Sequence, residues 1–279
     1  MTGPVRVLTE TVQIPMGEAS PMGGYLARPD GDGSYPGVVV GMELFGVSAH
    51  VRDVCEHLAG LGYVALAPDL YHRNAPGTEL PADEDGRVRG FALLNQLSRP
   101  QAIDDIRATI DYLSTRASTV AGMIGLSVGG HVAYLAATEL DLPTVVVAYG
   151  GWIPTADIPL SQPQPTITKT AGITSRVLVL VGDRDSLIPP EQRRQLTHAL
   201  TGAGVTHELV EYPDTGHGFL CDRRHSYQAS AAQDAWKRIE GLLASSKASS
   251  KSTSRPQRDY TDRLPAQNAE SVVAVDRAT

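Results

Sequence analysis

The chain has 279 residues, 42% of them hydrophobic, and a formal net charge of −7 at pH 7. Nucleic acids and anionic membranes attract basic surfaces, so this acidic balance argues against either as the main partner. No run approaches the roughly 20 consecutive apolar residues of a membrane span, and the first residues lack a signal-peptide layout. Only Cys55 and Cys221 could form a disulfide, so we expect a reducing, cytoplasmic setting. The length and hydrophobic content are enough for one sizeable core.

Apolar, β-branched segments alternate with segments of helical periodicity along most of the chain. The opening stretches "TETVQIPMG" and "GGYLARP" predict an edge hairpin, and apolar stripes predict helices within 48–62 and 100–113. This alternation predicts an α/β fold with a doubly wound, mostly parallel sheet and helices on both faces. Its further strands are expected at 35–42, 62–70, 119–126, 143–150, 175–182 and 206–213.

Two regions depart from this pattern. The proline-rich segment 150–173 separates two strands and is expected to form an excursion over the rim of the sheet. After Leu243 the chain is rich in serine, lysine and proline, which offers little to bury. We therefore expect a single domain over 1–243 and a disordered tail over 244–279.

The stretch "GLSVGG", residues 125–130, places Ser127 between a predicted strand and a predicted helix. It matches G-x-S-x-G, in which the glycines allow a sharp strand-to-helix turn that projects the serine above the sheet. Chemistry in parallel α/β sheets gathers at these carboxyl ends of strands. Ser127 is therefore a candidate nucleophile.

A serine nucleophile needs a base, and that base needs an acid to orient it. Asp183 and Asp185 follow the strand at 175–182, and His217 follows the strand at 206–213. The order serine, aspartate, histidine along the chain is that of the α/β-hydrolases. The sequence thus predicts this fold with a Ser-His-Asp triad.

Other kinds of site find no support in the sequence. The histidines show no H-E-x-x-H pattern, and neither G-x-G-x-x-G after the first strand nor G-x-x-x-x-G-K-[ST] occurs. Asp104 and Asp105 are expected to be solvated on the polar face of their helix. No metal and no cofactor is predicted.

Taken together, the motifs resemble the dienelactone hydrolase family. The strongest match is "MELFGVSAHVRDVCEHLAGLGYVALAPDLYHRNAPGTEL", Met42 to Leu80. "GLSVGG", "GDRDSLIPP" and "YPDTGHGF" match in the same order, so the resemblance extends to about Leu243. It implies that Ser127 is the nucleophile, His217 the base and Asp185, rather than Asp183, the acid. It also implies an accessory Glu43 and an oxyanion hole formed by the backbone amides of Leu44 and Val128.

The sequence departs from the family at the nucleophile, where the family has cysteine. A thiol can ionise near neutral pH, but a hydroxyl depends on its base, so the role of Glu43 does not carry over automatically. Glu43 could position water, pair with an arginine or have a raised pKa; the plain alternative is a solvated loop glutamate.

A second departure concerns substrate binding. The family binds an anionic substrate through arginines, and Cys221 stands where one of them is expected. Arg223 and Arg224 follow, displaced so far that they are expected to point elsewhere. Either Arg87 or Arg89 could match a second arginine. We therefore expect a larger or less anionic ester or lactone, admitted beneath 150–173.

The sequence thus predicts a serine hydrolase of a small-molecule carboxylic ester or lactone. An acyltransferase or cyclase would use the same residues with an acceptor other than water, because the fold does not decide the acceptor. A non-catalytic binding protein is disfavoured by the intact triad. The sequence leaves the oligomeric state open.

Overall fold

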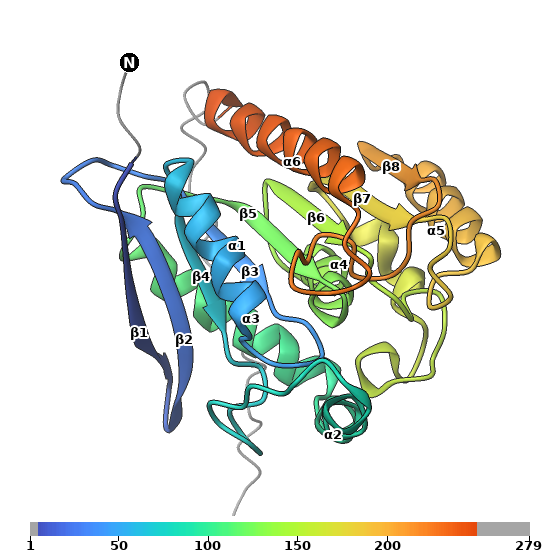
Figure 1. The fold of residues 1–279 in the computed structure, drawn as a ribbon, viewed down its shortest axis with the longest axis horizontal. Helices are drawn as coiled ribbons and strands as arrows, with labels where there is room; N and C mark the ends of the chain where they lie inside the picture. Colours follow the sequence, from blue (N-terminus) through green and yellow to red (C-terminus); the bar gives the residue numbers. More distant parts are fainter. Residues whose placement is uncertain (1–4, 250–279) are drawn as a thin grey trace, which may run out of the picture.

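The computed structural model describes residues 5–249, which form one eight-stranded mixed sheet with helices on both faces (Figure 1). The strand order is β1-β2-β4-β3-β5-β6-β7-β8. Each predicted strand is present, and the predicted α/β-hydrolase architecture is confirmed. The strands are β1 (Val7–Met16), β2 (Ala19–Pro29), β3 (Gly37–Gly41), β4 (Val64–Pro68), β5 (Val120–Leu126), β6 (Thr144–Ala148), β7 (Arg176–Gly182) and β8 (His207–Tyr212).

The predicted hairpin forms one edge of the sheet. Strand β1 pairs with β2, and β2 with β4, in antiparallel register, whereas every pair from β4 to β8 is parallel. All residues of β3, β4 and β6 are buried. This burial explains why their sequences are continuously apolar rather than alternating.

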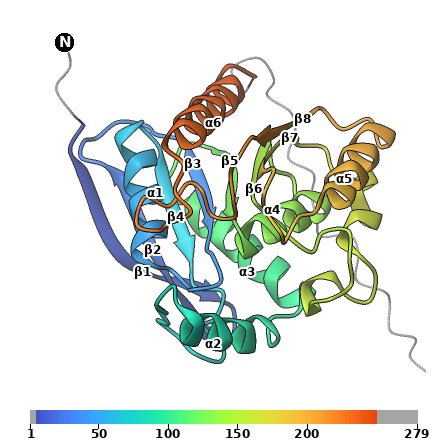
Figure 2. The ribbon, with the colours of Figure 1, turned by 45° about the vertical axis from the view of Figure 1, so that its right-hand side comes forward.

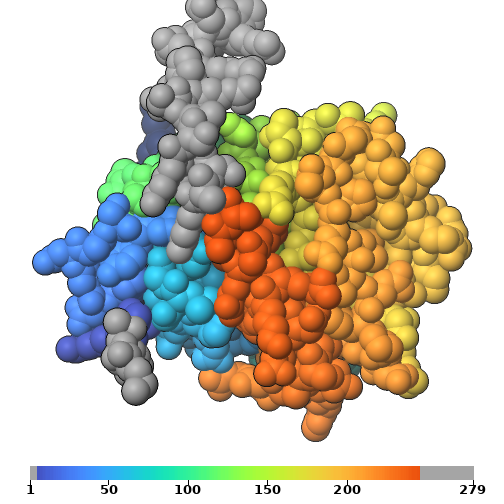
Figure 3. Space-filling model, turned by 90° about the horizontal axis from the view of Figure 1, so that it is seen from above, coloured from blue at the N-terminus to red at the C-terminus, as the bar shows by residue number. Residues whose placement is uncertain are grey.

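The helices are α1 (Ala49–Gly60), α2 (Glu84–Leu94), α3 (Arg99–Ser114), α4 (Val128–Glu139), α5 (Pro190–Gly202) and α6 (Ala229–Ser249). Helices α1 and α6 lie on one face of the sheet, and α3 and α4 lie on the other (Figures 1 and 2). The rings of His57 on α1 and Trp236 on α6 meet edge-on at 4.3 Å, which joins the two helices of the first face. In the space-filling view, α6 lies between the blue N-terminal segments and the amber segments near residue 200 (Figure 3).

Helix α2 was not predicted from the sequence. It begins at the cap Asp83, whose side chain accepts a hydrogen bond of 2.8 Å from the Gly86 amide. A Cβ atom on Gly90 would lie 2.7 Å from Leu44 Cγ, so this glycine lets the helix pack closely on Leu44. The two glycines weaken the helical pattern of the sequence while serving the packing of the helix.

The segment 150–173 does leave the sheet, and it is held against the body. It contains the short 3₁₀ helices Pro159–Ser161 and Thr166–Gly172. Arg99 at the start of α3 donates to the carbonyls of Leu160 and Gln164 and to the Thr166 hydroxyl. His131 of α4 is fully buried, and burial lowers its pKa to about 4, so the ring is neutral at pH 7. Its nitrogens bond the Gly151 carbonyl and the Thr166 hydroxyl, each at 2.8 Å.

The expectation for Asp105 is wrong, although Asp104 is exposed as predicted. Asp105 is completely buried and receives two hydrogen bonds, of 2.8 and 2.7 Å, from the guanidinium of Arg73. The helical pattern places Asp105 beside apolar positions, but it does not show that a cation from a distant segment meets it there. A buried carboxylate is stable only when it is paired in this way.

Helix α6 continues past Leu243 to Ser249, into the segment expected to be a tail. The rest of that segment, 250–279, lies outside the described residues. Within 5–249, none of the helices combines the length and the apolar character needed to cross a membrane.

Candidate active site

The turn between β5 and α4 holds Ser127 in a strained conformation. Its φ of 54° and ψ of −114° lie outside the regions that a serine ordinarily occupies. A Cβ atom on Gly125 would lie 1.9 Å from the Gly129 carbonyl oxygen, and one on Gly129 would lie 2.3 Å from the Gly41 carbonyl oxygen. Both glycines of the motif are therefore required by close backbone approach.

Ser127, His217 and Asp185 form a continuous chain of hydrogen bonds. Ser127 Oγ lies 2.8 Å from His217 Nε2, and His217 Nδ1 lies 2.8 Å from Asp185 Oδ2. In this arrangement Nδ1–H donates to the carboxylate, which leaves Nε2 free to accept the serine proton. The structure therefore brings the three residues together as a triad requires.

Asp183 takes no part in this chain. It is exposed, and its Oδ1 accepts a hydrogen bond of 3.3 Å from the Thr215 amide. Asp185 is only 3% exposed, and its second oxygen accepts a hydrogen bond of 2.9 Å from the Leu187 amide. The geometry therefore selects Asp185 as the partner of His217.

Val128 directly follows the serine at the start of α4, and Leu44 lies in the turn that follows β3. The Gly129 amide donates to the Met42 carbonyl at 2.9 Å, which fixes the start of α4 against the segment leading to Leu44. Within the part of the chain that the structure describes, neither the Leu44 nor the Val128 N–H donates to another protein group. Both remain available for an oxyanion, and the N-terminus of α4 adds favourable potential.

Glu43 is buried in an ion pair rather than solvated. Its side chain is 1% exposed, and its Oε2 accepts a hydrogen bond from the guanidinium of Arg224. The same guanidinium lies over the ring of Phe45, 4.9 Å from its centroid. Of the roles considered for Glu43, pairing with an arginine is the one that the structure contains.

Tyr149, which the sequence analysis did not single out, connects Glu43 to the triad. Its hydroxyl lies 3.5 Å from Glu43 Oε1, and its ring meets that of His217 edge-on at 5.2 Å. Burial, followed by the negative charge of Glu43, raises the pKa of this phenol well above its usual range. A tyrosine after a strand gives no distinctive sequence signal, so only the fold identifies it.

The candidate substrate-binding arginines are not brought to this site. Arg87 and Arg89 are exposed on α2 and pair within it, with Glu84 at 3.5 Å and Asp85 at 3.7 Å. Arg223 forms two hydrogen bonds with Asp53 of α1, at 2.7 and 3.1 Å.

Cys221 and Arg224, which lie close to Arg223 in the sequence, are both more buried than these exposed arginines. Cys221 is 1% exposed, and burial raises the pKa of its thiol, so it presents no charge. Arg224, expected to point elsewhere, is instead the residue that reaches Glu43. The expectation is therefore wrong for Arg224.

The sheet order, the strained serine turn and the serine–histidine–aspartate chain define the class of this protein as an α/β-hydrolase. Comparison with known families narrows the class, because the family model described as "Dienelactone hydrolase family" matches residues 22–246. The chain belongs to the dienelactone hydrolase family.

Similar proteins extend over most of the chain. A Synechocystis sp. protein provisionally named carboxymethylenebutenolidase is 39% identical over 242 residues, covering 86% of this chain and 97% of its own. The carboxymethylenebutenolidase of Pseudomonas putida is 29% identical, covering 85% and 97%. A crystal structure from Klebsiella pneumoniae, provisionally named a dienelactone hydrolase, matches with a TM-score of 0.77 at 29% identity and covers 86% and 99%.

Proposed function

We propose that this protein hydrolyses a carboxylic ester or lactone through an acyl intermediate on Ser127. The observation that carries the proposal is the pair of 2.8 Å contacts that joins Ser127, His217 and Asp185. The names of the similar proteins refer to a butenolide, which is a lactone, and so support the same class of substrate.

In the first half of the reaction, Ser127 Oγ attacks the carbonyl carbon while His217 Nε2 accepts the hydroxyl proton. The negative charge that develops on the carbonyl oxygen is stabilised by the amides of Leu44 and Val128. The carbon–oxygen bond to the alcohol then breaks, and His217 returns its proton to the departing alkoxide. The product is an acyl-serine and a free alcohol, or in a lactone an alcohol still attached to the acyl chain.

In the second half, water replaces the alcohol. His217 deprotonates the water, the hydroxide attacks the acyl carbon, and Ser127 leaves with the proton from His217. Transfer to another acceptor, or cyclisation, would proceed from the same intermediate. The names of the similar proteins favour water.

A fluorophosphonate probe tests this proposal, because it reacts with a serine that a neighbouring base activates. We expect stoichiometric labelling of the folded protein, located on Ser127 by peptide mass spectrometry, and release of acid from a simple ester. Folded protein that neither labels nor releases acid would contradict the proposal.

The charges around the site favour a neutral substrate. Arg224 is already paired with Glu43 and stacked on Phe45, and Cys221 offers no cation. A substrate carboxylate at Arg224 would have to lie beside the buried carboxylate of Glu43, and two like charges so close together are unfavourable. We propose that the natural substrate is less anionic than a dienelactone.

This substrate preference predicts that kcat/KM for a neutral ester exceeds that for dienelactone of similar size by about tenfold or more, since a neutral ester brings no second negative charge beside Glu43. The measurement is steady-state hydrolysis of both compounds by the wild type and by Arg224→Gln, with Arg223→Gln as the matched surface control. A preference for dienelactone that Arg224→Gln abolishes and Arg223→Gln retains would show that Arg224 binds the substrate carboxylate.

A further inference from the structure

Tyr71 contacts one of the two residues whose amides form the proposed oxyanion hole. It follows β4, is 2% exposed, and its hydroxyl donates a hydrogen bond of 3.1 Å to the Leu44 carbonyl. Burial and the nearby Asp69 raise the pKa of this phenol, so its proton stays available for donation at every pH of interest. The bond joins Leu44 to a segment 27 residues further along the chain.

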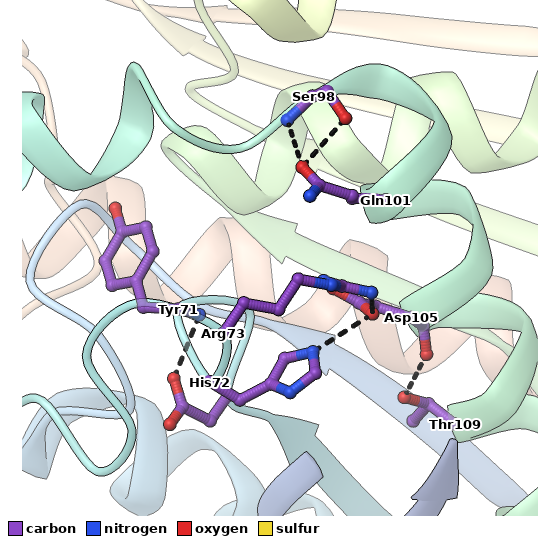
Figure 4. A network of polar contacts seen from close by, with 8 residues as sticks. Tyr71, His72, Arg73, Ser98, Gln101, Asp105 and Thr109 are labelled. Carbon is purple, nitrogen blue, oxygen red and sulfur yellow. Dashed lines mark hydrogen bonds and ion pairs between the residues drawn. The ribbon is translucent and has the colours of Figure 1, made fainter. Parts of the chain in front are cut away.

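Two buried carboxylates hold the segment that carries Tyr71. Asp69 Oδ1 accepts a hydrogen bond from the Tyr71 amide at 3.0 Å, and Oδ2 accepts one from the Gly77 amide at 2.7 Å. Asp105 of α3 pairs with Arg73 and lies 3.3 Å from His72 Nε2. Figure 4 shows His72 and Arg73 directed toward Asp105 while the Tyr71 side chain extends the other way.

The same segment also fixes the turn that contains Leu44. The Gly46 amide closes the turn on the Glu43 carbonyl at 3.2 Å, and the Leu80 amide donates to the Phe45 carbonyl at 3.0 Å. Gly46 has a φ of +82°, and a Cβ atom there would lie 2.1 Å from the Thr78 carbonyl oxygen. The turn therefore lies directly on residues 78–80, and Tyr71 reaches it from the other end of the segment.

We propose that Tyr71 is a positioning residue that holds Leu44 so that its amide faces the developing oxyanion, with Asp105 as the anchor of its segment. An oxyanion-hole donor acts through geometry set before the reaction, so a freer Leu44 stabilises the transition state less while substrate binding changes little. The inference rests on the proposed acyl-serine mechanism, because only that mechanism needs the Leu44 amide.

The test compares Tyr71→Phe with Tyr134→Phe. Tyr134 is a matched control because it is also fully buried, and its hydroxyl contacts Thr170 at 2.5 Å, outside the proposed machinery. Each variant loses one buried hydroxyl contact. We expect Tyr71→Phe to lower kcat for a neutral ester about tenfold with KM within about twofold, the loss of one well-placed hydrogen bond. Tyr134→Phe should leave both constants unchanged.

The inhibition constant of a transition-state analogue distinguishes a positioning role from a purely structural one, because a loss of stability alone would not change it. A trifluoromethyl ketone accepts Ser127 Oγ and forms an anionic hemiketal whose oxygen occupies the oxyanion hole. We expect its inhibition constant to rise in Tyr71→Phe by the same factor as kcat/KM falls. Asp105→Asn, which removes the charge that anchors Arg73, should shift kcat and the inhibition constant in the same direction.

The outcomes separate this proposal from the proposed function. If the wild type neither labels with a fluorophosphonate nor hydrolyses esters, the proposed function fails. If the wild type is active, but Tyr71→Phe and Tyr134→Phe have equal kcat and equal inhibition constants, the hydroxyl of Tyr71 serves stability alone and the positioning proposal is overturned. Should Tyr71→Phe not fold, an unchanged inhibition constant in folded Asp105→Asn overturns it equally.

Discussion

Replacing Ser127 by alanine leaves a folded protein whose ester turnover is less than about one hundredth of the wild-type rate, because loss of a triad member removes covalent catalysis as a whole. The stability cost is small, since only a hydroxyl and its contact with His217 disappear. Steady-state kinetics with a chromogenic ester and a thermal melt measure the two effects.

Ser186→Ala is the control for this variant. Ser186 is exposed and adjacent to Asp185. This variant therefore tests whether the loss of a serine hydroxyl near the site is enough to lower turnover. We expect wild-type kinetics from Ser186→Ala. Retention of more than about one hundredth of the activity in Ser127→Ala would remove Ser127 from the mechanism.

Asp185→Asn lowers kcat by at least about a thousandfold, because an amide no longer holds the Nδ1–H tautomer of His217 that leaves Nε2 free to accept a proton. The contact that changes is the 2.8 Å hydrogen bond between His217 Nδ1 and Asp185 Oδ2, where a neutral amide replaces the carboxylate. The measurement is kcat across pH 6 to 9, together with the rate of fluorophosphonate labelling.

Asp183→Asn is the matched control, two residues earlier on the same loop. Its Oδ1 only accepts a hydrogen bond from the Thr215 amide, and an asparagine oxygen can still do so. We expect kcat within about threefold of wild type, the range of a weakened neutral hydrogen bond. Equal losses in the two variants, or a larger loss in Asp183→Asn, would refute the assignment of Asp185.

The sheet and the serine–histidine–aspartate chain were predictable because short-range rules determine them. Buried parallel strands are continuously apolar, and the ends of such strands meet at one edge, so Ser127, Asp185 and His217 could be grouped from the sequence alone. The close backbone approach at Gly125 and Gly129 also leaves a direct mark in the sequence, since no other residue fits there.

The residues that were not predicted depend on contacts between distant loops. Arg224 reaches Glu43 from a loop 181 residues away, and no periodicity decides which of two consecutive arginines turns inward. Asp105 is buried for a similar reason, because its partner Arg73 is 32 residues distant in the chain. Helix α2 was not predicted because Gly86 and Gly90, which allow close packing, lower the helical propensity of its sequence.

The attachment of the 150–173 excursion to Arg99 and His131 means that the excursion moves with the body of the domain rather than independently of it. Lifting the excursion would break three hydrogen bonds of a buried guanidinium, which opposes movement of the segment as a whole. Trp152 of the excursion meets Phe91 of α2 edge-on at 6.1 Å, with both side chains half-buried. Rotation of these two rings is far faster than movement of a whole segment, so the surface of the excursion can rearrange while its attachment to the body stays intact.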